Sequence, residues 1–212
     1  MTAKMTRSDA WQMGQCLRSN SRIFGRPAGA AVWARTGNAG PSHIQQAWKT
    51  AYTIKKPGIY AFYFDPTPYW EPAENKYIIH QTKTYVAAFG AEEGWDAEVG
   101  LKAEIVPLTR PFGLYAGNVF QGVVKFKGKP LAGVDVEVEY WNADRKVTAP
   151  NDYFVAQVVK TDKNGFFTFA VPQAGWWGFA ALTTEKQAIQ DQDGKKKDAE
   201  YGALLWVQNS KN

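Results

Sequence analysis

Several residue types are missing from most of this sequence. Its 212 residues contain a single cysteine, Cys16, and no serine, cysteine or methionine occurs between His43 and Asn209. Nucleophilic catalysis by serine or cysteine is therefore excluded there, as are disulfides and cysteine-ligated metal clusters. Motifs of serine hydrolases, zinc peptidases and phosphate-binding loops are absent as well, so we expect the protein not to be an enzyme.

Long apolar runs are also missing. No uninterrupted apolar stretch approaches the roughly 18 residues that a transmembrane helix needs, so we expect no membrane insertion. Disorder is excluded by the opposite property, since 45% of the residues are hydrophobic and 15% are aromatic. We therefore expect a folded protein with a sizeable core.

Positive charge is not spread evenly along the chain. Of 25 basic and 20 acidic residues, six basic residues and one acidic residue lie within residues 1–40. The rest of the chain therefore carries 19 of each sign (25 less 6, and 20 less 1) and has no net charge. A basic surface for nucleic acid needs clustered positive charge, so we expect no nucleic-acid partner.

Residues 1–45 form an atypical basic leader, rich in Arg, Ala, Gly and Ser and without strand or helix periodicity. The stretch WQMGQCLRSN does not supply the roughly 7–15 apolar residues of a secretory signal, and no signal peptide is visible. Three interpretations remain open for this segment. It is an organelle transit peptide, a disordered basic tail, or the product of a misassigned start.

The remaining chain predicts many short strands separated by turns. One strand is clearly amphipathic, because Val134, Val136 and Val138 alternate with acidic residues. The predicted strands are residues 48–54, 59–64, 77–86, 101–108, 119–126, 134–140, 154–161, 166–171, 176–182 and 201–207. Short strands at roughly 8–12-residue spacing predict an all-β fold built from β-sandwiches.

Three predicted loops separate these strands. Residues 65–75 contain three prolines, which exclude a central strand, so we expect a loop that exposes Tyr69 and Trp70. Residues 91–100 form an acidic, glycine-punctuated loop, and residues 187–197 form a polar excursion. The tryptophans in or beside loops suggest an aromatic binding surface; they are Trp70, Trp95, Trp176 and Trp177.

Two modules are predicted, an N-terminal β module at residues 46–110 and a C-terminal β-sandwich at residues 111–209. The second contains a Gly-Lys-Pro-Leu-Ala-Gly turn, then an Asp-x-x-Gly turn, then an aromatic strand. This order of elements resembles the carboxypeptidase-regulatory and prealbumin-like modules, which have an Ig-like sandwich architecture. Such a resemblance speaks about fold and not about function.

Several longer blocks resemble one bacterial family. The blocks PYWEPAENKYIIHQTKT, AAFGAEEGWD, EIVPLTRPFGLYAGNVFQGVVK and PQAGWWGFAAL are similar to the periplasmic nickel-uptake substrate-specific (NikM-like) family. The resemblance implies a periplasmic or extracytoplasmic location, Ni²⁺ or Co²⁺ as the bound ion, and a cobalt/nickel membrane transporter component as partner. The signal peptide and N-terminal histidine usual in that family are missing here.

Candidate metal ligands follow from this resemblance. Nickel favours imidazole nitrogen, with carboxylate oxygen as a weaker partner, which selects His80, His43 and Glu71. The acidic loop offers further oxygen donors. A lone strand histidine is more often a packed or hydrogen-bonded residue than a ligand, and an acidic loop is more often simply solvated.

We therefore expect a non-enzymatic accessory protein that captures a divalent ion or presents it to a membrane transporter. The alternative is a structural or protein-interaction β-sandwich with aromatic binding loops and no metal.

Overall fold

The computed structural model describes residues 2–5, 22–27, 32–34, 50–142 and 144–212. These residues contain no α-helix and one short 3-10 helix, η2 (Asp152–Phe154). The strands are β1 (Thr2–Met5), β2 (Arg22–Pro27), β3 (Val32–Ala34), β4 (Thr50–Thr53), β5 (Gly58–Asp65), β6 (Tyr69–Glu71), β7 (Lys76–Ala88), β8 (Ala103–Pro107), β9 (Leu114–Tyr115), β10 (Val119–Phe126), β11 (Lys129–Pro130), β12 (Asp135–Tyr140), β13 (Ala156–Lys160), β14 (Phe166–Ala170), β15 (Gly175–Gln190) and β16 (Lys196–Ser210). The predicted all-β fold is confirmed.

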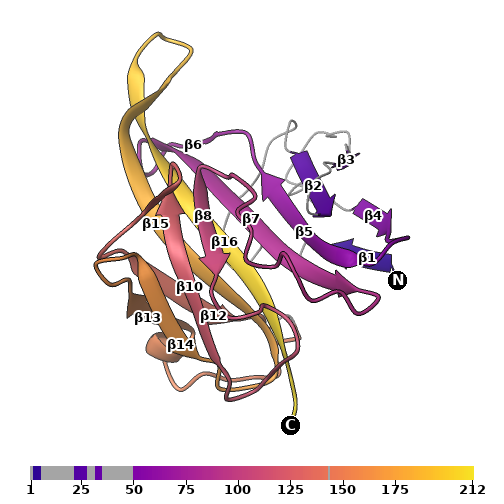
Figure 1. Ribbon diagram of the computed structural model, residues 1–212. Helices are drawn as coiled ribbons and strands as arrows, with labels where there is room; N and C mark the ends of the chain where they lie inside the picture. Colours follow the sequence, from indigo (N-terminus) through magenta and orange to yellow (C-terminus); the bar gives the residue numbers. More distant parts are fainter. Residues whose placement is uncertain (1, 6–21, 28–31, 35–49, 143) are drawn as a thin grey trace.

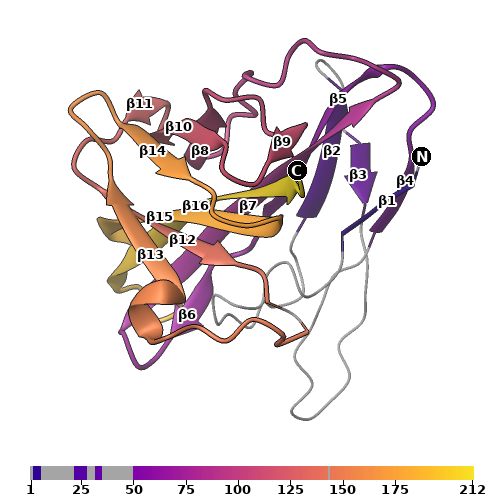
Figure 2. The same ribbon diagram turned by 90° about the horizontal axis from the view of Figure 1, so that it is seen from below.

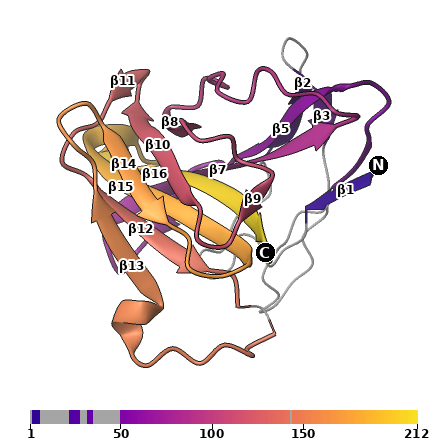
Figure 3. The ribbon, with the colours of Figure 1, turned by 60° about the horizontal axis from the view of Figure 1, so that its bottom comes forward.

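Most of the strands belong to two sheets that form a sandwich. The larger sheet runs in the order β13-β12-β15-β16-β7-β5-β2-β3, with β6 added beside β7 and β9 beside β16. The smaller sheet runs β11-β10-β14, with β8 also paired to β10. The smaller sheet lies across one face of the larger one (Figures 1 and 3), and β1 pairs with β4 apart from both.

The main hydrophobic core lies between these two sheets. Phe120 and Phe167 enter it from the smaller sheet and meet Phe179 of β15, with the Phe120 and Phe179 ring centroids 4.7 Å apart. The predicted alternation of β12 is confirmed, because Val136 and Val138 are fully buried in this core. Apolar residues at alternate positions of β12, β15 and β16 therefore face the smaller sheet and hold the two layers together.

Strand β7 has two faces with different surroundings. Its odd-numbered residues Ile79 and Tyr85 belong to the main core, so its even-numbered residues, among them His80, point to the opposite side of the larger sheet. We call that side the outer face. Strand β16 runs parallel to β7, with Glu200 opposite Ile78 and Gly202 opposite His80. Glu200 and His80 consequently lie on the same face of neighbouring strands.

Two predicted loops and one predicted strand differ in part from the structure. Tyr69 and Trp70 belong to strand β6 and are half-buried, because β6 pairs with β7 in spite of the flanking prolines. The predicted polar excursion at 187–197 is mostly strand, since β15 continues to Gln190 and β16 begins at Lys196 (Figure 1). Phe154 lies in η2 and is exposed, so the strand predicted at 154–161 is shorter, at Ala156–Lys160.

The predicted boundary near residue 110 falls between β8 and β9. Strands from both sides of it share sheets, since β8 pairs with β10 and β7 pairs with β16. The division into modules 46–110 and 111–209 stays a prediction. Most of the predicted leader at 1–45 lies outside the described residues. Across the part of the chain that the structure describes, no helix has the length and apolarity needed to span a membrane.

Candidate functional site

The first candidate site is a group of charged side chains on the outer face. His80 Nε2 lies 3.4 Å from Glu200 Oε1, and Lys76 Nζ lies 2.5 Å from Glu200 Oε2. Lys76 Nζ is also 2.5 Å from Glu74 Oε2. We call these four residues, Glu74, Lys76, His80 and Glu200, the outer cluster. Its members come from β7, β16 and the turn before β7, which are joined by backbone hydrogen bonds.

A glycine makes room for the histidine in this cluster. Gly202 stands opposite His80 on β16, and a Cβ added to it would lie 2.6 Å from His80 Cδ2. The imidazole therefore lies directly over the β16 backbone, where it reaches Glu200. The side chains of His80 and Glu200 are 13% and 14% exposed, so both are largely shielded from solvent.

The charges of the outer cluster stabilise one another. The contact with His80 and the ammonium of Lys76 lower the pKa of Glu200 from 4.5 to about 2. Hydrogen bonds to Glu200 and Glu74 raise the pKa of Lys76 above its ordinary value. Glu200 is therefore an ionised carboxylate at any pH above about 4. An imidazole beside an ionised carboxylate is a pair of donors that a divalent transition metal accepts.

The three predicted ligands are not all found together. Glu71 stands opposite Lys76 in the β6–β7 pair and therefore lies on the outer face, where its Oε1 accepts a hydrogen bond from the Ala73 amide. His43 lies outside the described residues. Glu200 was missed by sequence reasoning, because nothing in its local sequence links it to a histidine 120 positions earlier.

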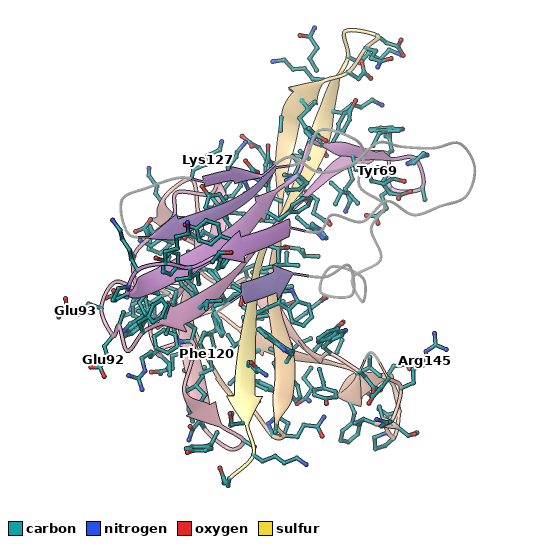
Figure 4. All side chains as sticks on the ribbon, turned by 90° about the vertical axis from the view of Figure 1, so that its right-hand side faces the viewer. Tyr69, Glu92, Glu93, Phe120, Lys127 and Arg145 are labelled. Atoms are coloured by element: carbon teal, nitrogen blue, oxygen red, sulfur yellow. The ribbon has the colours of Figure 1, made fainter. Side chains whose placement is uncertain are left out.

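The acidic loop does not contribute to the outer cluster. Glu92 and Glu93 are exposed and lie beyond the end of β7 that is remote from β6. Figure 4 shows both side chains projecting outward on the side of the molecule away from Tyr69 of β6. Among the described residues, no three His, Cys, Asp or Glu side chains are grouped so that they could hold a metal ion. Within the outer cluster, His80 and Glu200 contact each other, and Glu74 contacts Lys76.

A second group of charges lies on the opposite face of β7, between the sheets. Lys83 Nζ is 2.5 Å from Glu104 Oε1 of β8, and both side chains are almost completely buried. The same carboxylate accepts backbone hydrogen bonds from Val99, Gly100 and Leu101 at 2.9, 3.0 and 3.2 Å. We call Lys83, Glu104 and these three amides the inner cluster. It ties the end of the acidic loop to both sheets.

Burial dominates the electrostatics of the inner cluster. It lowers the pKa of Lys83, and the adjacent Glu104 carboxylate opposes this shift. Burial also raises the pKa of the neighbouring Tyr85, whose hydroxyl has no hydrogen-bond partner among the described residues. A buried charge pair with a satisfied acceptor has a structural role, because removing either partner strands the other in a low dielectric. Sequence reasoning missed this pair as well.

Two of the four tryptophans of the predicted aromatic surface pack against other side chains. Trp177 is buried, and Trp70 packs edge-on against Tyr77 with their ring centroids 5.1 Å apart. Among the described residues, the most exposed large hydrophobic side chain is Tyr153 of η2, at 86%, and the adjacent Phe154 is 57% exposed. They precede β13, which is an edge strand of the larger sheet (Figure 2).

Comparison with protein families gives one match. A family model described as "Domain of unknown function (DUF4198)" matches residues 28–185 of the 212, and the chain belongs to this family. No curated protein matches the chain. The match includes His80 and Lys76 and ends before β16, which nevertheless lies between β15 and β7 in the larger sheet.

Proposed function

We propose that this member of the DUF4198 family is a non-enzymatic, extracytoplasmic binding protein for a divalent transition-metal ion, Ni²⁺ or Co²⁺. The observation that carries the proposal is the contact between His80 Nε2 and the ionised Glu200 carboxylate on two paired strands. The resemblance to the NikM-like family supports the choice of metal and of a membrane transporter as the recipient.

The ionised state of the Glu200 carboxylate suits metal binding. A ligand must be free of its proton, and metal affinity falls when a proton has to be displaced. Glu200 meets this condition because its pKa is about 2. His80 turns its Nε2 toward the same carboxylate, and a bound metal would take the place of any proton on that nitrogen.

Lys76 makes binding an exchange of one cation for another. Its ammonium contacts both Glu200 and Glu74, each at 2.5 Å. When a divalent ion binds His80 and Glu200, Lys76 gives up Glu200 and keeps Glu74. The incoming ion carries more charge than the ammonium that it replaces, which favours the exchange. Glu71, on the same face, is a predicted source of a further oxygen donor.

A site with two or three protein ligands leaves coordination positions open. Closed four-ligand sites hold a metal as part of the fold, whereas open sites retain water or accept a ligand from outside. We therefore expect reversible binding, weaker than that of a structural site. Reversible binding is what delivery of an ion to a transporter requires.

Calorimetric titration of the full chain with NiCl₂ tests the proposal. We expect saturable binding that is lost in His80→Ala and in Glu200→Gln. Lys76→Met removes the competing ammonium, so it is expected to tighten binding. Glu92→Gln is the matched control, since it removes a carboxylate from the exposed acidic loop, and His43→Ala measures any part played by the second predicted imidazole.

Two results would contradict the metal proposal. One is the absence of saturable binding in the native chain. The other is unchanged binding in the His80→Ala, Glu200→Gln double variant.

A protein-interaction module is the second candidate function. The observation in its favour is the exposure of Tyr153 and Phe154 beside an edge strand, since large exposed aromatics at the rim of a sheet are common in protein interfaces. This candidate needs no metal. It depends on whether the surface beside β13 binds another protein.

A further inference from the structure

Strand β13 is an edge of the larger sheet and is poorly protected. Only β12 pairs with it among the described strands. Natural edge strands avoid further pairing through proline, bulges or clustered charge. β13 has the sequence AQVVK, without proline, and the Val158 side chain at its centre is 56% exposed. This edge is therefore open to another strand.

The backbone directions in β13 show which residues offer hydrogen bonds outward. The Thr161 amide donates to Val134 O, and the Thr161 carbonyl accepts from the Gly133 amide, so both groups of Thr161 point toward β12. Backbone groups of successive residues point to opposite edges of a strand. Ala156, Val158 and Lys160 therefore direct their N–H and C=O groups to the free edge.

The free edge is limited to β13 itself. Just beyond Lys160, the Asp162 amide donates to Phe166 O, and the chain turns into β14, which joins the other sheet. At the other end, η2 interrupts the extended backbone. Figure 3 shows β13 at the margin of the sandwich, with η2 at its start. A partner strand consequently has five residues to pair with, Ala156–Lys160.

We propose that two copies of this chain pair antiparallel through β13, with Val158 opposite Val158 of the partner subunit. In this register Ala156 stands opposite Lys160 of the partner subunit, and the three outward-directed residues of each copy satisfy one another. The larger sheets of the two copies then form one continuous sheet across a two-fold axis.

Charge complementarity favours a second copy as the occupant. Glu139 stands opposite Ala156 in the β12–β13 pair, and Lys160 forms an ion pair with Asp135. In the proposed register, Lys160 of the partner subunit lies beyond the small Ala156, about 9.5 Å from the β12 backbone, within reach of the Glu139 carboxylate. Burial and the neighbouring Glu137 raise the pKa of Glu139, so this carboxylate gains from an added cation.

The apolar side chains agree with the same pairing. The two Val158 side chains meet at the axis and leave water together, and directly opposed β-branched residues stabilise antiparallel strands. The exposed run Tyr153–Val155 lies immediately before β13, so it comes beside the end of the partner strand. The pairing is independent of the metal proposal and gives the second candidate function a partner.

Sedimentation of the full chain over a concentration series reaching the millimolar range tests the pairing. We expect the mass to rise from that of one chain to that of two. Val158→Lys is expected to keep the protein monomeric, because pairing would place two ammonium groups face to face. Within its own chain the new lysine lies beside Glu137, so we expect the fold to tolerate it. Val158→Glu is likewise expected to be monomeric, and an equimolar mixture of the two variants is expected to form heterodimers.

The matched control is Val119→Lys, which adds the same charge at an exposed valine of the smaller sheet. It is expected to leave the dimer intact. A native chain that stays monomeric throughout the series overturns the proposal. So does a dimer that persists in Val158→Lys, or one that is lost equally in Val119→Lys.

Oxidative cross-linking gives a second test of the pairing, because a disulfide traps even a weakly associating dimer. In a Cys16→Ser background, Val158→Cys places two sulfurs on residues whose Cα atoms are about 5.5 Å apart in the proposed pair, which is within the range of a disulfide. We expect a covalent dimer on oxidation with this variant and not with Val119→Cys. Equal cross-linking of both variants would show random collision and would overturn the register.

Discussion

The inner and outer clusters occupy opposite faces of the same strand, β7, and differ in how their charges are satisfied. Glu104 of the inner cluster has an ammonium and three backbone amides as partners and almost no contact with water. Glu200 of the outer cluster contacts His80 and a partly exposed lysine that has another carboxylate beside it. We propose that partners of the first kind are fixed and that those of the second kind can be exchanged for another cation.

This difference assigns different roles to the two clusters. A fully buried ion pair costs too much desolvation to be opened for a ligand, so it serves the fold. A partly exposed carboxylate with a replaceable cation can accept a new one at little cost. Equal effects of substitutions in the two clusters on stability and on Ni²⁺ binding would contradict these roles.

The largest expected effect is in the inner cluster. Glu104→Leu leaves the Lys83 ammonium buried without a counter-charge and removes the acceptor of three amides, so we expect a loss of about 3–5 kcal/mol in the free energy of unfolding. Lys83→Met is expected to cost less, because the carboxylate keeps its backbone donors. Urea unfolding of the two variants measures both losses. A larger loss of unfolding free energy in Lys83→Met than in Glu104→Leu would show that the backbone donors do not stabilise Glu104.

A smaller effect is expected at the glycine under the histidine. Gly202→Ala places a methyl group 2.6 Å from His80 Cδ2, which forces the imidazole away from Glu200. Overpacking of this kind costs about 1–3 kcal/mol, and we also expect weaker Ni²⁺ binding. Gly178→Ala is the matched control on the same face, since its added methyl meets Trp206 at 3.0 Å and leaves His80 in place. Equal Ni²⁺ affinity in the two variants would show that the position of the His80 ring does not affect Ni²⁺ binding.

The smallest effect is the pH dependence that Glu200 contributes. Its pKa in the folded protein is about 2, below the ordinary 4.5, so its ion pairs stabilise the fold above pH 4.5. That contribution is lost as the pH falls from about 4.5 toward 2. Because the cluster is partly exposed, we expect about 1 kcal/mol or less.

The measurement is the unfolding free energy of the native chain and Glu200→Gln between pH 6 and pH 2. The difference between them should shrink toward acid pH. A difference that stays constant over this range would mean that Glu200 is not held ionised by its neighbours.

The sequence predicted the strands well where the pattern is local. Val136 and Val138 alternate with acids, and both are buried as that alternation requires. Strand β10 lies where it was predicted, at Val119–Phe126. Such strand patterns depend only on residues that are close together in the sequence. The same holds for turns, since the Asp162 side chain accepts hydrogen bonds from the Asn164 and Phe166 amides in a turn that the sequence predicts.

The candidate site could be predicted only in part, because its second half is distant in the sequence. His80 was singled out by residue type, but its partner Glu200 is brought to it by the parallel pairing of β7 and β16, which no local pattern encodes. Proline density likewise gave the wrong state for Tyr69–Glu71, since β6 is a short edge piece whose pairing with β7 outweighs its propensity. Strand pairing decided both cases, between distant strands for His80 and Glu200 and between adjacent strands for β6.

The most direct test of these two roles is to measure Ni²⁺ affinity and unfolding free energy on the same two variants, Glu200→Gln and Lys83→Met. Glu200→Gln is predicted to lose Ni²⁺ binding and to keep nearly all of its stability. Lys83→Met is predicted to lose stability and, while folded, to bind Ni²⁺ as the native chain does. Native-like Ni²⁺ affinity in Glu200→Gln would contradict the assignment of the outer cluster as the binding site.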